Sequence, residues 1–381
     1  MNFKELSPGI TALAILGSCL TLTPSVTLSK VDAATNLKML IPLYSFPTDA
    51  DPKSGNTYWN EVATAAKTSP KVDITVIIDP NNGPNSNGPD QNYKDGLNEL
   101  RAAGVHILGY VFTGRGLCFP QEIPSNGICK ATVPFAGEDQ PAPTVGKIKA
   151  DVDTYYNKYR SVNGESLIDG IFFDEFANPV NEGDKLKIYA ELYNYVKLKN
   201  RNIRPLVVAN PGTQLDSSEF PQVLKAADVF VVYENNPEHP DNGEQKRWVE
   251  TGYTDESQYT SQFASLLYAA PNAEDAPIAR NSSSYLELMG TYVAHAAEQG
   301  FGYVFITDNK STSNPWSNLP SYWKEEVRYI TQVNSTTVPA SLRNGQNQLE
   351  LRGHYCGRAQ VARLRHLHDV RGRFLNEGRY P

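Results

Sequence analysis

Short apolar runs rich in β-branched residues alternate along this chain with longer segments in which apolar residues recur at helical spacing. Runs such as residues 74–78 (Ile-Thr-Val-Ile-Ile) and 229–233 (Val-Phe-Val-Val-Tyr) are apolar at almost every position. This pattern is typical of strands in a parallel sheet whose faces are covered by helices. It predicts eight strands, at residues 37–44, 72–78, 105–111, 168–174, 205–209, 229–234, 264–269 and 302–307.

Eight helical segments follow these strands in turn, and the sixth of them has the weakest pattern. They are predicted at residues 57–68, 92–103, 145–159, 184–199, 219–226, 244–262, 284–299 and 322–330. Eight βα units in succession favour one α/β domain built as a closed (β/α)8 TIM barrel, a fold that uses about 250 residues. An open doubly wound sheet is the alternative. No Gly-x-Gly-x-x-Gly motif follows any predicted strand, which removes the usual dinucleotide-binding form of that fold.

The amino-terminal segment, residues 1–34, predicts a cleaved secretory signal peptide. It has Lys4 near its start, an apolar run at 10–22 that is too short for a stable membrane anchor, and Val-Asp-Ala before Ala34. The Leu-Gly-Ser-Cys sequence that ends at Cys19 also resembles a lipoprotein processing box. We therefore expect a secreted protein, or, if Cys19 is lipidated, one that is held at the membrane surface.

The chain changes character after residue 335. Residues 336–381 contain eight Arg and no Lys, with few aliphatic residues in any period, which predicts a disordered Arg-rich tail. A single domain is therefore expected at residues 35–335. The formal net charge of −7 argues against a nucleic-acid partner held by phosphate contacts and favours a neutral or cationic ligand. We expect a monomer without a cofactor.

A loop rich in Pro, Gly and Ser, residues 114–143, separates the third predicted strand from its helix. Long loops after barrel strands commonly shape the ligand site. Cys118 and Cys129 lie in this loop, and an exported protein permits a disulfide between them. Because no His or further Cys lies near them, they make a poor zinc site, and no metal is expected. Cys356 remains as a free thiol in the tail.

Polar residues at the carboxyl ends of barrel strands face the mouth of the barrel, where catalysis is found in this fold. The fourth predicted strand ends in Asp174 and Glu175. Unpaired carboxylates are costly inside a buried strand, so both acids are expected to leave the core at this point. Because side chains alternate along a strand, Asp174 shares the inward direction of Phe172, and Glu175 would reach the mouth from the first loop residue. The alternative is that one acid caps the next helix or pairs with a nearby Arg.

Glu234 ends the sixth predicted strand, two strands round from Asp174. Neighbouring strands lie about 4.8 Å apart, so the two carboxyl groups can approach to roughly 5 to 5.5 Å, as in a retaining glycosidase, or stay farther apart, as in an inverting one. An acid with a raised pKa would protonate the leaving oxygen, while the other stays ionised and faces the anomeric carbon. The alternative reading of Glu234 is a structural side chain bonded to backbone at the rim.

Amide and tyrosine side chains at other strand ends predict the part of the site that binds sugar. Amides offer a donor and an acceptor to hydroxyl and acetamido groups, and Tyr offers a ring face and a hydroxyl. The candidate substrate-binding residues are Tyr44, Asp79, Asn81, Asn82, Tyr110, Asn210 and Tyr233. The Asn-Asn-Gly-Pro run at 81–84 is equally explained as a turn, because each of these residues favours turns.

At these positions the sequence resembles the spherulin-4-like (spherulation-specific) family of microbial exopolysaccharide glycosidases. The most specific motif is Gly-Ile-Phe-Phe-Asp-Glu at residues 170–175. The other matching segments, in the order of the family, are residues 41–44 with Trp59, 77–84, 108–113 and 210–212.

The resemblance implies a (β/α)8 fold and, from characterised fungal relatives, an endo-α-1,4-N-acetylgalactosaminidase that acts on galactosaminogalactan. The catalytic acids of the family fall on Asp174, Glu175 and Glu234, the residues that the strand ends predict. Two departures bear on the substrate. Asp79 stands where the family usually has Asn, and the Cys-bearing insert is longer than the usual loop.

The main hypothesis is hydrolysis of a secreted amino-sugar polysaccharide, with Asp174 as nucleophile, Glu234 as acid/base and Glu175 as a supporting acid. A non-catalytic polysaccharide-binding or coat protein on the same barrel is the alternative, although such a protein would need neither of the first two acids. A metal-dependent deacetylase is a poorer reading, because His239 and His295 show no ligand spacing.

Overall fold

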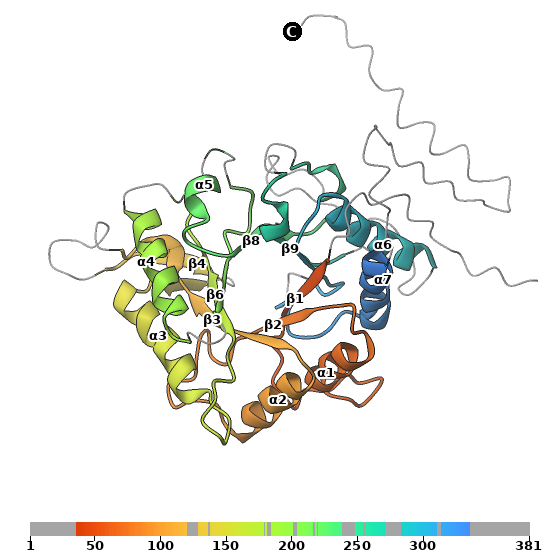
Figure 1. Cartoon of the computed structure of the whole chain (residues 1–381), viewed down its shortest axis with the longest axis horizontal. Helices are drawn as coiled ribbons and strands as arrows, with labels where there is room; N and C mark the ends of the chain where they lie inside the picture. Colours follow the sequence, from red (N-terminus) through yellow and green to blue (C-terminus); the bar gives the residue numbers. More distant parts are fainter. Residues whose placement is uncertain are drawn as a thin grey trace, which may run out of the picture. The chain divides into compact units, whose positions relative to one another are not determined.

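Eight parallel strands close into a barrel in the computed structural model (Figure 1). Around the barrel the strands follow the order β1, β10, β9, β8, β7, β6, β3 and β2. Their bounds are β1 Lys38–Pro42, β2 Ile74–Ile78, β3 His106–Phe112, β6 Gly170–Asp174, β7 Leu206–Ala209, β8 Val229–Asn235, β9 Phe263–Leu267 and β10 Tyr303–Ile306. The prediction of a closed (β/α)8 barrel is confirmed, and the open sheet is wrong.

The structure describes residues 36–119, 129–135, 138–178, 180, 184–200, 204–215, 218, 220–237, 248–253, 257–270, 283–310 and 314–335. All of them belong to the first of two units into which the chain divides, Met1–Leu342. The predicted signal peptide with Cys19, the predicted tail with Cys356, and His239 lie outside the described residues.

α-Helices cover the outside of the barrel (Figure 1). They are α1 Tyr58–Thr68, α2 Gln91–Ala102, α3 Val145–Lys158, α4 Lys185–Lys197, α5 Phe220–Val223, α6 Ser283–Glu298 and α7 Trp323–Ser335. The first three begin where the side chain of Thr57, Asp90 or Thr144 accepts a hydrogen bond from the backbone N–H three residues on. None of the helices among the described residues is long and apolar enough to cross a membrane.

The weakest predicted helix, residues 244–262, is not an α-helix in its described part. Two 3-10 turns, Trp248–Glu250 and Thr260–Gln262, are found there instead. The indole of Trp248 is fully buried and donates to the backbone oxygen of Tyr292 on α6 at 3.2 Å. A single buried aromatic side chain thus anchors this segment in place of a helical apolar stripe.

The insert after β3 contains structure that the sequence did not predict. Thr132–Phe135 (β4) and Glu138–Pro141 (β5) pair as an antiparallel hairpin. The predicted disulfide between Cys118 and Cys129 is confirmed, with Cα atoms 5.6 Å apart. It joins the segment that follows β3 to the strand pair, so the insert is tied to the barrel near the end of β3.

Alternate residues of each strand fill the interior of the barrel. Register pairs Ile77 with Leu108 and Tyr110 with Phe172, and all four side chains are buried. Phe172 in turn lies opposite Val208 on β7. The same alternation, continued to the carboxyl ends of the strands, directs a set of polar and aromatic side chains toward the mouth of the barrel: Tyr44, Asp79, Tyr110, Asp174 and Asn210.

Strand β8 carries a β-bulge between Val231 and Tyr233, where the register against β9 shifts. Val231 lies opposite Ala264 and Tyr233 lies opposite Ser265, so Val232 is the extra residue. An extra residue reverses the alternation of the side chains that follow it. Glu234 therefore joins the inward-facing set, while Tyr233 points toward the helices.

Candidate active site

Two carboxylates meet at one amide at the carboxyl end of the barrel. Asp174 ends β6, Asn210 follows β7, and Glu234 lies in β8 beyond the bulge. The Nδ2 of Asn210 donates to Oδ1 of Asp174 at 2.7 Å and to Oε2 of Glu234 at 2.6 Å. Since the two hydrogens of an amide nitrogen diverge, the acids flank the amide and do not bond to each other.

The orientation of the Asn210 side chain is fixed by its other contacts. Its Oδ1 accepts a hydrogen bond from the backbone N–H of Gly212 at 2.9 Å. Its own backbone N–H donates to Phe173 at 2.9 Å, and its carbonyl accepts from Phe176 at 2.9 Å. With the amide oxygen occupied by a donor, the amide nitrogen must face the two acids.

Asp174 is buried and accepts two hydrogen bonds. Besides Asn210, the hydroxyl of Tyr110 donates to its Oδ2 at 2.6 Å. Burial raises the pKa of Asp174 to about 6, and the negative charge of Glu175 adds to this effect. The bonds from Tyr110 and Asn210 oppose the rise, because they stabilise the ionised form.

The pKa of Glu234 is raised as well. Burial raises its pKa to about 7, and the charge of Asp174 is the next largest cause. Hydrogen bonding from Asn210 and from the side chain of Trp316 opposes this rise. Because both pKa values are raised and each acid acts on the other, the pair retains a proton near neutral pH.

Trp316 is a site residue that the sequence did not predict. It lies between β10 and α7, with its ring largely buried against Phe305 and Tyr268. Its backbone oxygen accepts from the N–H of Tyr44 at 3.3 Å. It lies nine residues beyond the end of the predicted strand 302–307, in a segment whose sequence has neither strand nor helix periodicity.

Glu175 is held in place by residues at the start of the insert after β3. Its backbone has a left-handed φ of 49°, and so does that of Arg115, at 55°. The Nε of Arg115 pairs with Oε2 of Glu175 at 2.5 Å, and the Arg115 N–H donates to the Glu175 carbonyl at 2.7 Å. Thr113 Oγ1 donates to the carbonyls of Asp174 and Glu175, each at 2.8 Å. The alternative of an acid paired with a nearby Arg therefore holds for Glu175.

Tyr44 and Asp79 lie on the other side of Tyr110 from Asn210. The ring of Tyr44 meets that of Tyr110 edge to face at 5.9 Å, and its pKa is raised by burial and by the charges of Asp174, Asp79 and Glu234. Asp79 accepts from the N–H of Gly83 at 2.6 Å. Burial raises the pKa of Asp79 to about 6, and the charge of Asp174 contributes.

Three of the predicted binding residues lie apart from this group. Asn81 and Asn82 are exposed, and Asn82 has a left-handed φ of 47° in a turn closed by the Asp79–Gly83 bond. The ring of Tyr233 packs on Trp248 at 5.0 Å, and its hydroxyl lies 3.4 Å from the Asn236 carbonyl. The bulge in β8 is the reason that Tyr233 points away from the acids.

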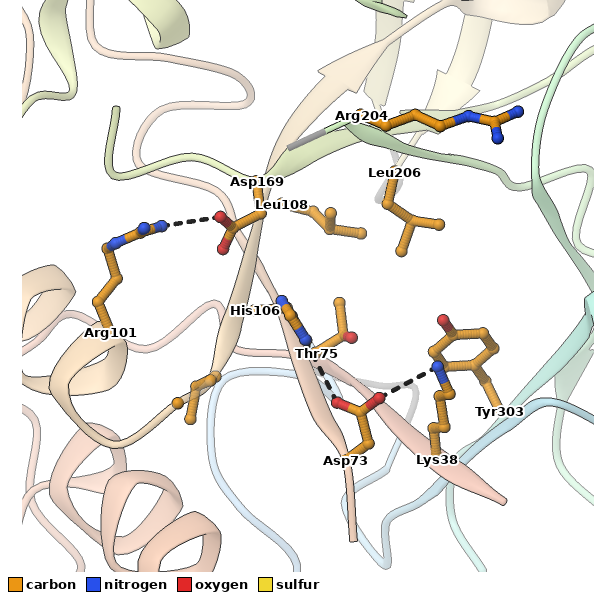
Figure 2. Close-up of a pocket in the computed structure, with 12 residues that line it drawn as sticks. Lys38, Asp73, Thr75, Arg101, His106, Leu108, Asp169, Arg204, Leu206 and Tyr303 are labelled. Carbon is orange, nitrogen blue, oxygen red and sulfur yellow. Dashed lines mark hydrogen bonds and ion pairs between the residues drawn. The ribbon is translucent and has the colours of Figure 1, made fainter. Parts of the chain in front are cut away.

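A cavity of about 560 Å³ lies at the opposite, amino-terminal end of the barrel (Figure 2). It is lined by residues at the starts of strands, among them Lys38, His106 and Tyr303. Two ion pairs lie in its lining, Lys38 with Asp73 at 3.1 Å and Arg101 with Asp169 at 2.8 Å. Within the described ranges, no cluster of three His, Cys, Asp or Glu residues could hold a metal ion.

Comparisons with known proteins agree with the resemblance read from the motifs. A family model described as spherulation-specific family 4 matches residues 38–330. Spherulin-4 of Physarum polycephalum is 29% identical over 300 residues, which are 78% of this chain and 71% of that protein. The solved structure of Aspergillus clavatus Sph3 in complex with GalNAc has a TM-score of 0.54 and 22% sequence identity, over 77% of this chain and 97% of that chain. That protein has the same fold.

Proposed function

Because this chain belongs to spherulation-specific family 4, we propose that it is a glycoside hydrolase that cleaves an amino-sugar polysaccharide. The observation that carries the proposal is the pair of carboxylates on either side of the Asn210 amide, the buried Asp174 and the partly exposed Glu234. A binding module has no need for two adjacent acids with raised pKa values, whereas acid/base catalysis near neutral pH depends on them.

The environments of the two acids assign their roles. Asp174 receives hydrogen bonds from Tyr110 and Asn210, which favour the carboxylate and suit a nucleophile. Glu234 accepts from Asn210 but not from Tyr110, and its pKa is raised to about 7 by burial and by the charge of Asp174, which suits the general acid. An Asp174 oxygen attacks the anomeric carbon as the glycosidic bond breaks. The electron pair of the broken bond goes to the leaving oxygen, which takes the proton of Glu234. Glu234 then deprotonates the water that releases the sugar from Asp174.

This sequence of steps retains the anomeric configuration. The Asp174 and Glu234 oxygens that accept from Asn210 share one nitrogen as their donor. The distance between these two oxygens is therefore at most the sum of the two hydrogen-bond lengths. That limit lies within the spacing of about 5 to 5.5 Å of retaining enzymes and below the roughly 6.5 to 9.5 Å of inverting ones. Glu175, held by Arg115, supplies a further negative charge beside the nucleophile.

The substrate that we propose is a polymer of the kind cut by an endo-α-1,4-N-acetylgalactosaminidase. Sph3 of A. clavatus, which shares the fold, is described in complex with GalNAc. The side chains that would contact the sugar are Tyr44, Asp79, Tyr110 and Asn210, and the exposed Asn81 and Asn82 would meet the chain beyond it.

We propose that the enzyme is exported by the signal peptide at residues 1–34 and acts as a monomeric barrel spanning 35–335. The Cys118–Cys129 disulfide fits an oxidising compartment. Lipidation of Cys19 would instead anchor the protein to a membrane, and the Arg-rich segment 336–381 would remain an appendage.

The test uses purified protein and a panel of α- and β-linked hexosaminan polymers, with reducing ends and fragment masses as the readout. We expect internal cleavage of an α-linked hexosaminan, and turnover at least about 100-fold lower for Asp174→Asn and Glu234→Gln. Polymer binding without cleavage of any member of the panel would favour the polysaccharide-binding or coat protein.

A further inference from the structure

The mouth of the barrel has two chemically different sides. Strand order places Asp79, Asp174 and Glu234 on β2, β6 and β8, with β3 and β7 between them. The opposite side, formed by β1, β9 and the segment after β10, carries aromatic residues, Tyr44, Tyr268 and Trp316. We refer to Asp79, Asp174, Glu175 and Glu234 as the acidic arc, and to the three aromatic residues as the aromatic arc.

Positive charge is scarce along the acidic arc. Among the described residues, Glu175 forms an ion pair with Arg115, and the other three carboxylates of the arc form none. The other three acids contact neutral donors: the Gly83 N–H for Asp79, Tyr110 and Asn210 for Asp174, and Asn210 for Glu234. With Glu234 protonated as the general acid, Glu175 paired with Arg115 and Asp174 facing the reacting carbon, Asp79 is the member of the arc whose charge has no counterpart among the described residues.

Asp79 lies at the mouth of the barrel, on the strand next to that of Tyr110 and close enough to Asp174 for the charge of Asp174 to act on it. The leaving group must point toward Glu234, which donates the proton. The rest of the sugar ring therefore extends from Asp174 in the other direction, across Tyr110 on β3 and toward Asp79 on β2. The C2 substituent is bonded to the carbon next to the anomeric carbon, so it is within reach of Asp79 when the C2 edge of the ring, and not the ring oxygen, faces β2.

We propose that Asp79 selects a hexosamine with a free 2-ammonium group, so that the preferred substrate is a partly de-N-acetylated, cationic polymer. This inference rests on the proposed function. A charge-assisted hydrogen bond from the ammonium group to the half-buried Asp79 carboxylate would replace the neutral contacts that an acetamido group makes. The apolar face of the sugar ring would lie on the aromatic arc.

The competing role of Asp79 is purely structural, as the acceptor that closes the turn to Gly83. Asp79→Asn separates the two roles, because the amide oxygen still accepts that N–H while the charge is gone. Asp51→Asn is the matched control: Asp51 also accepts backbone N–H bonds, from Lys53 and Ser54, but lies in a turn outside the acidic arc.

The experiment compares one α-linked galactosamine polymer in its fully N-acetylated and partly de-N-acetylated forms. Values of kcat/KM are measured at low and high salt, and inhibition by galactosamine and by N-acetylgalactosamine gives a readout that does not depend on chain cleavage. We expect the wild type to favour the de-N-acetylated polymer and galactosamine by about 10-fold or more. Asp79→Asn should abolish this preference, which is read as the ratio of the two kcat/KM values and of the two inhibition constants whatever the absolute activity of the variant, and Asp51→Asn should keep the ratios of the wild type.

The outcomes distinguish the inference from the function on which it rests. A wild type that cleaves the acetylated polymer equally well or better overturns the role of Asp79 and leaves the glycosidase intact. An unchanged preference in Asp79→Asn, or an equal loss in Asp51→Asn, assigns the preference to general attraction of a polycation and overturns the inference. A wild type that cleaves neither polymer overturns the proposed function itself.

Discussion

The hydroxyl of Tyr110 donates a 2.6 Å hydrogen bond to Oδ2 of Asp174 from the neighbouring strand. This bond stabilises the ionised form of the acid, so Tyr110→Phe should raise the pKa of Asp174 further. The acidic limb of the kcat/KM profile should then move to higher pH by about 1 to 2 units. Tyr156→Phe is the control, since the buried hydroxyl of Tyr156 has no hydrogen-bond partner among the described residues. An unchanged profile in Tyr110→Phe would show that the titration of Asp174 does not determine the acidic limb.

Chemical rescue tests the assignment of the nucleophile. In Asp174→Gly, azide can occupy the vacated space and attack the anomeric carbon, so we expect partial recovery of cleavage and a glycosyl azide of inverted configuration. In Glu234→Gly, activity should depend on how good the leaving group is, because an activated aryl glycoside needs little protonation. If azide instead rescued only the Glu234 variant and gave a glycosyl azide of inverted configuration, Glu234 would be the nucleophile and Asp174 the acid/base.

Thermal stability should rise when Glu234 is replaced by Gln. The pKa of Glu234 is about 7 in the folded protein against an ordinary value of 4.5, so the folded state binds more protons between these values. Stability therefore falls as pH rises through this window, and the variant avoids this loss. We expect Glu234→Gln to be more stable at pH 8 by on the order of 2 kcal/mol and to match the wild type near pH 4. Glu325→Gln, which removes a partly exposed surface carboxylate paired with Arg328, should change stability little at either pH, and a lower Tm for Glu234→Gln at pH 8 would contradict the argument.

The Cys118–Cys129 disulfide should stabilise the insert that presents Arg115 to Glu175. Closing a loop of this length contributes about 3 kcal/mol at most, so the Cys118→Ser/Cys129→Ser double variant should have a lower Tm. Reductant should lower the Tm of the wild type and leave that of the double variant unchanged. Two titratable thiols at these positions in native, oxidised protein would contradict the pairing.

Much of this site follows from alternation along the strands. Asp174 is two positions after Phe172, so both side chains point to the inside of the barrel. Together with the barrel fold, this alternation predicts that Asp174 lies beside residues of the neighbouring strands. Asp79, Tyr110 and Asn210 follow from the same rule, because β2, β3 and β7 are regular to their ends. Regular parallel strands leave little freedom in where a side chain points.

The parts that could not be predicted depend on tertiary contacts. Alternation along residues 229–234 would direct Tyr233 inward and Glu234 outward, and only the register against β9 reveals the bulge. Trp316 lies in an irregular segment whose path depends on packing against Phe305 and Tyr268. The 3-10 turn at Trp248 likewise forms because of a contact with α6, which no local pattern encodes.

The bulge in β8 also determines how this barrel tolerates insertions and deletions. Loss of the extra residue Val232 would restore ordinary pairing and would keep Glu234 facing the mouth, because Glu234 would then lie two positions after the inward-facing Val231. If the strand instead paired regularly with Val232 retained, Glu234 would turn toward the helices and the Tyr233 ring would come to the mouth. The register at the end of β8 therefore matters more to the proposed proton donor than the number of residues in the strand, and a shift of one residue would remove Glu234 from the mouth while every residue of the acidic arc remained in the sequence.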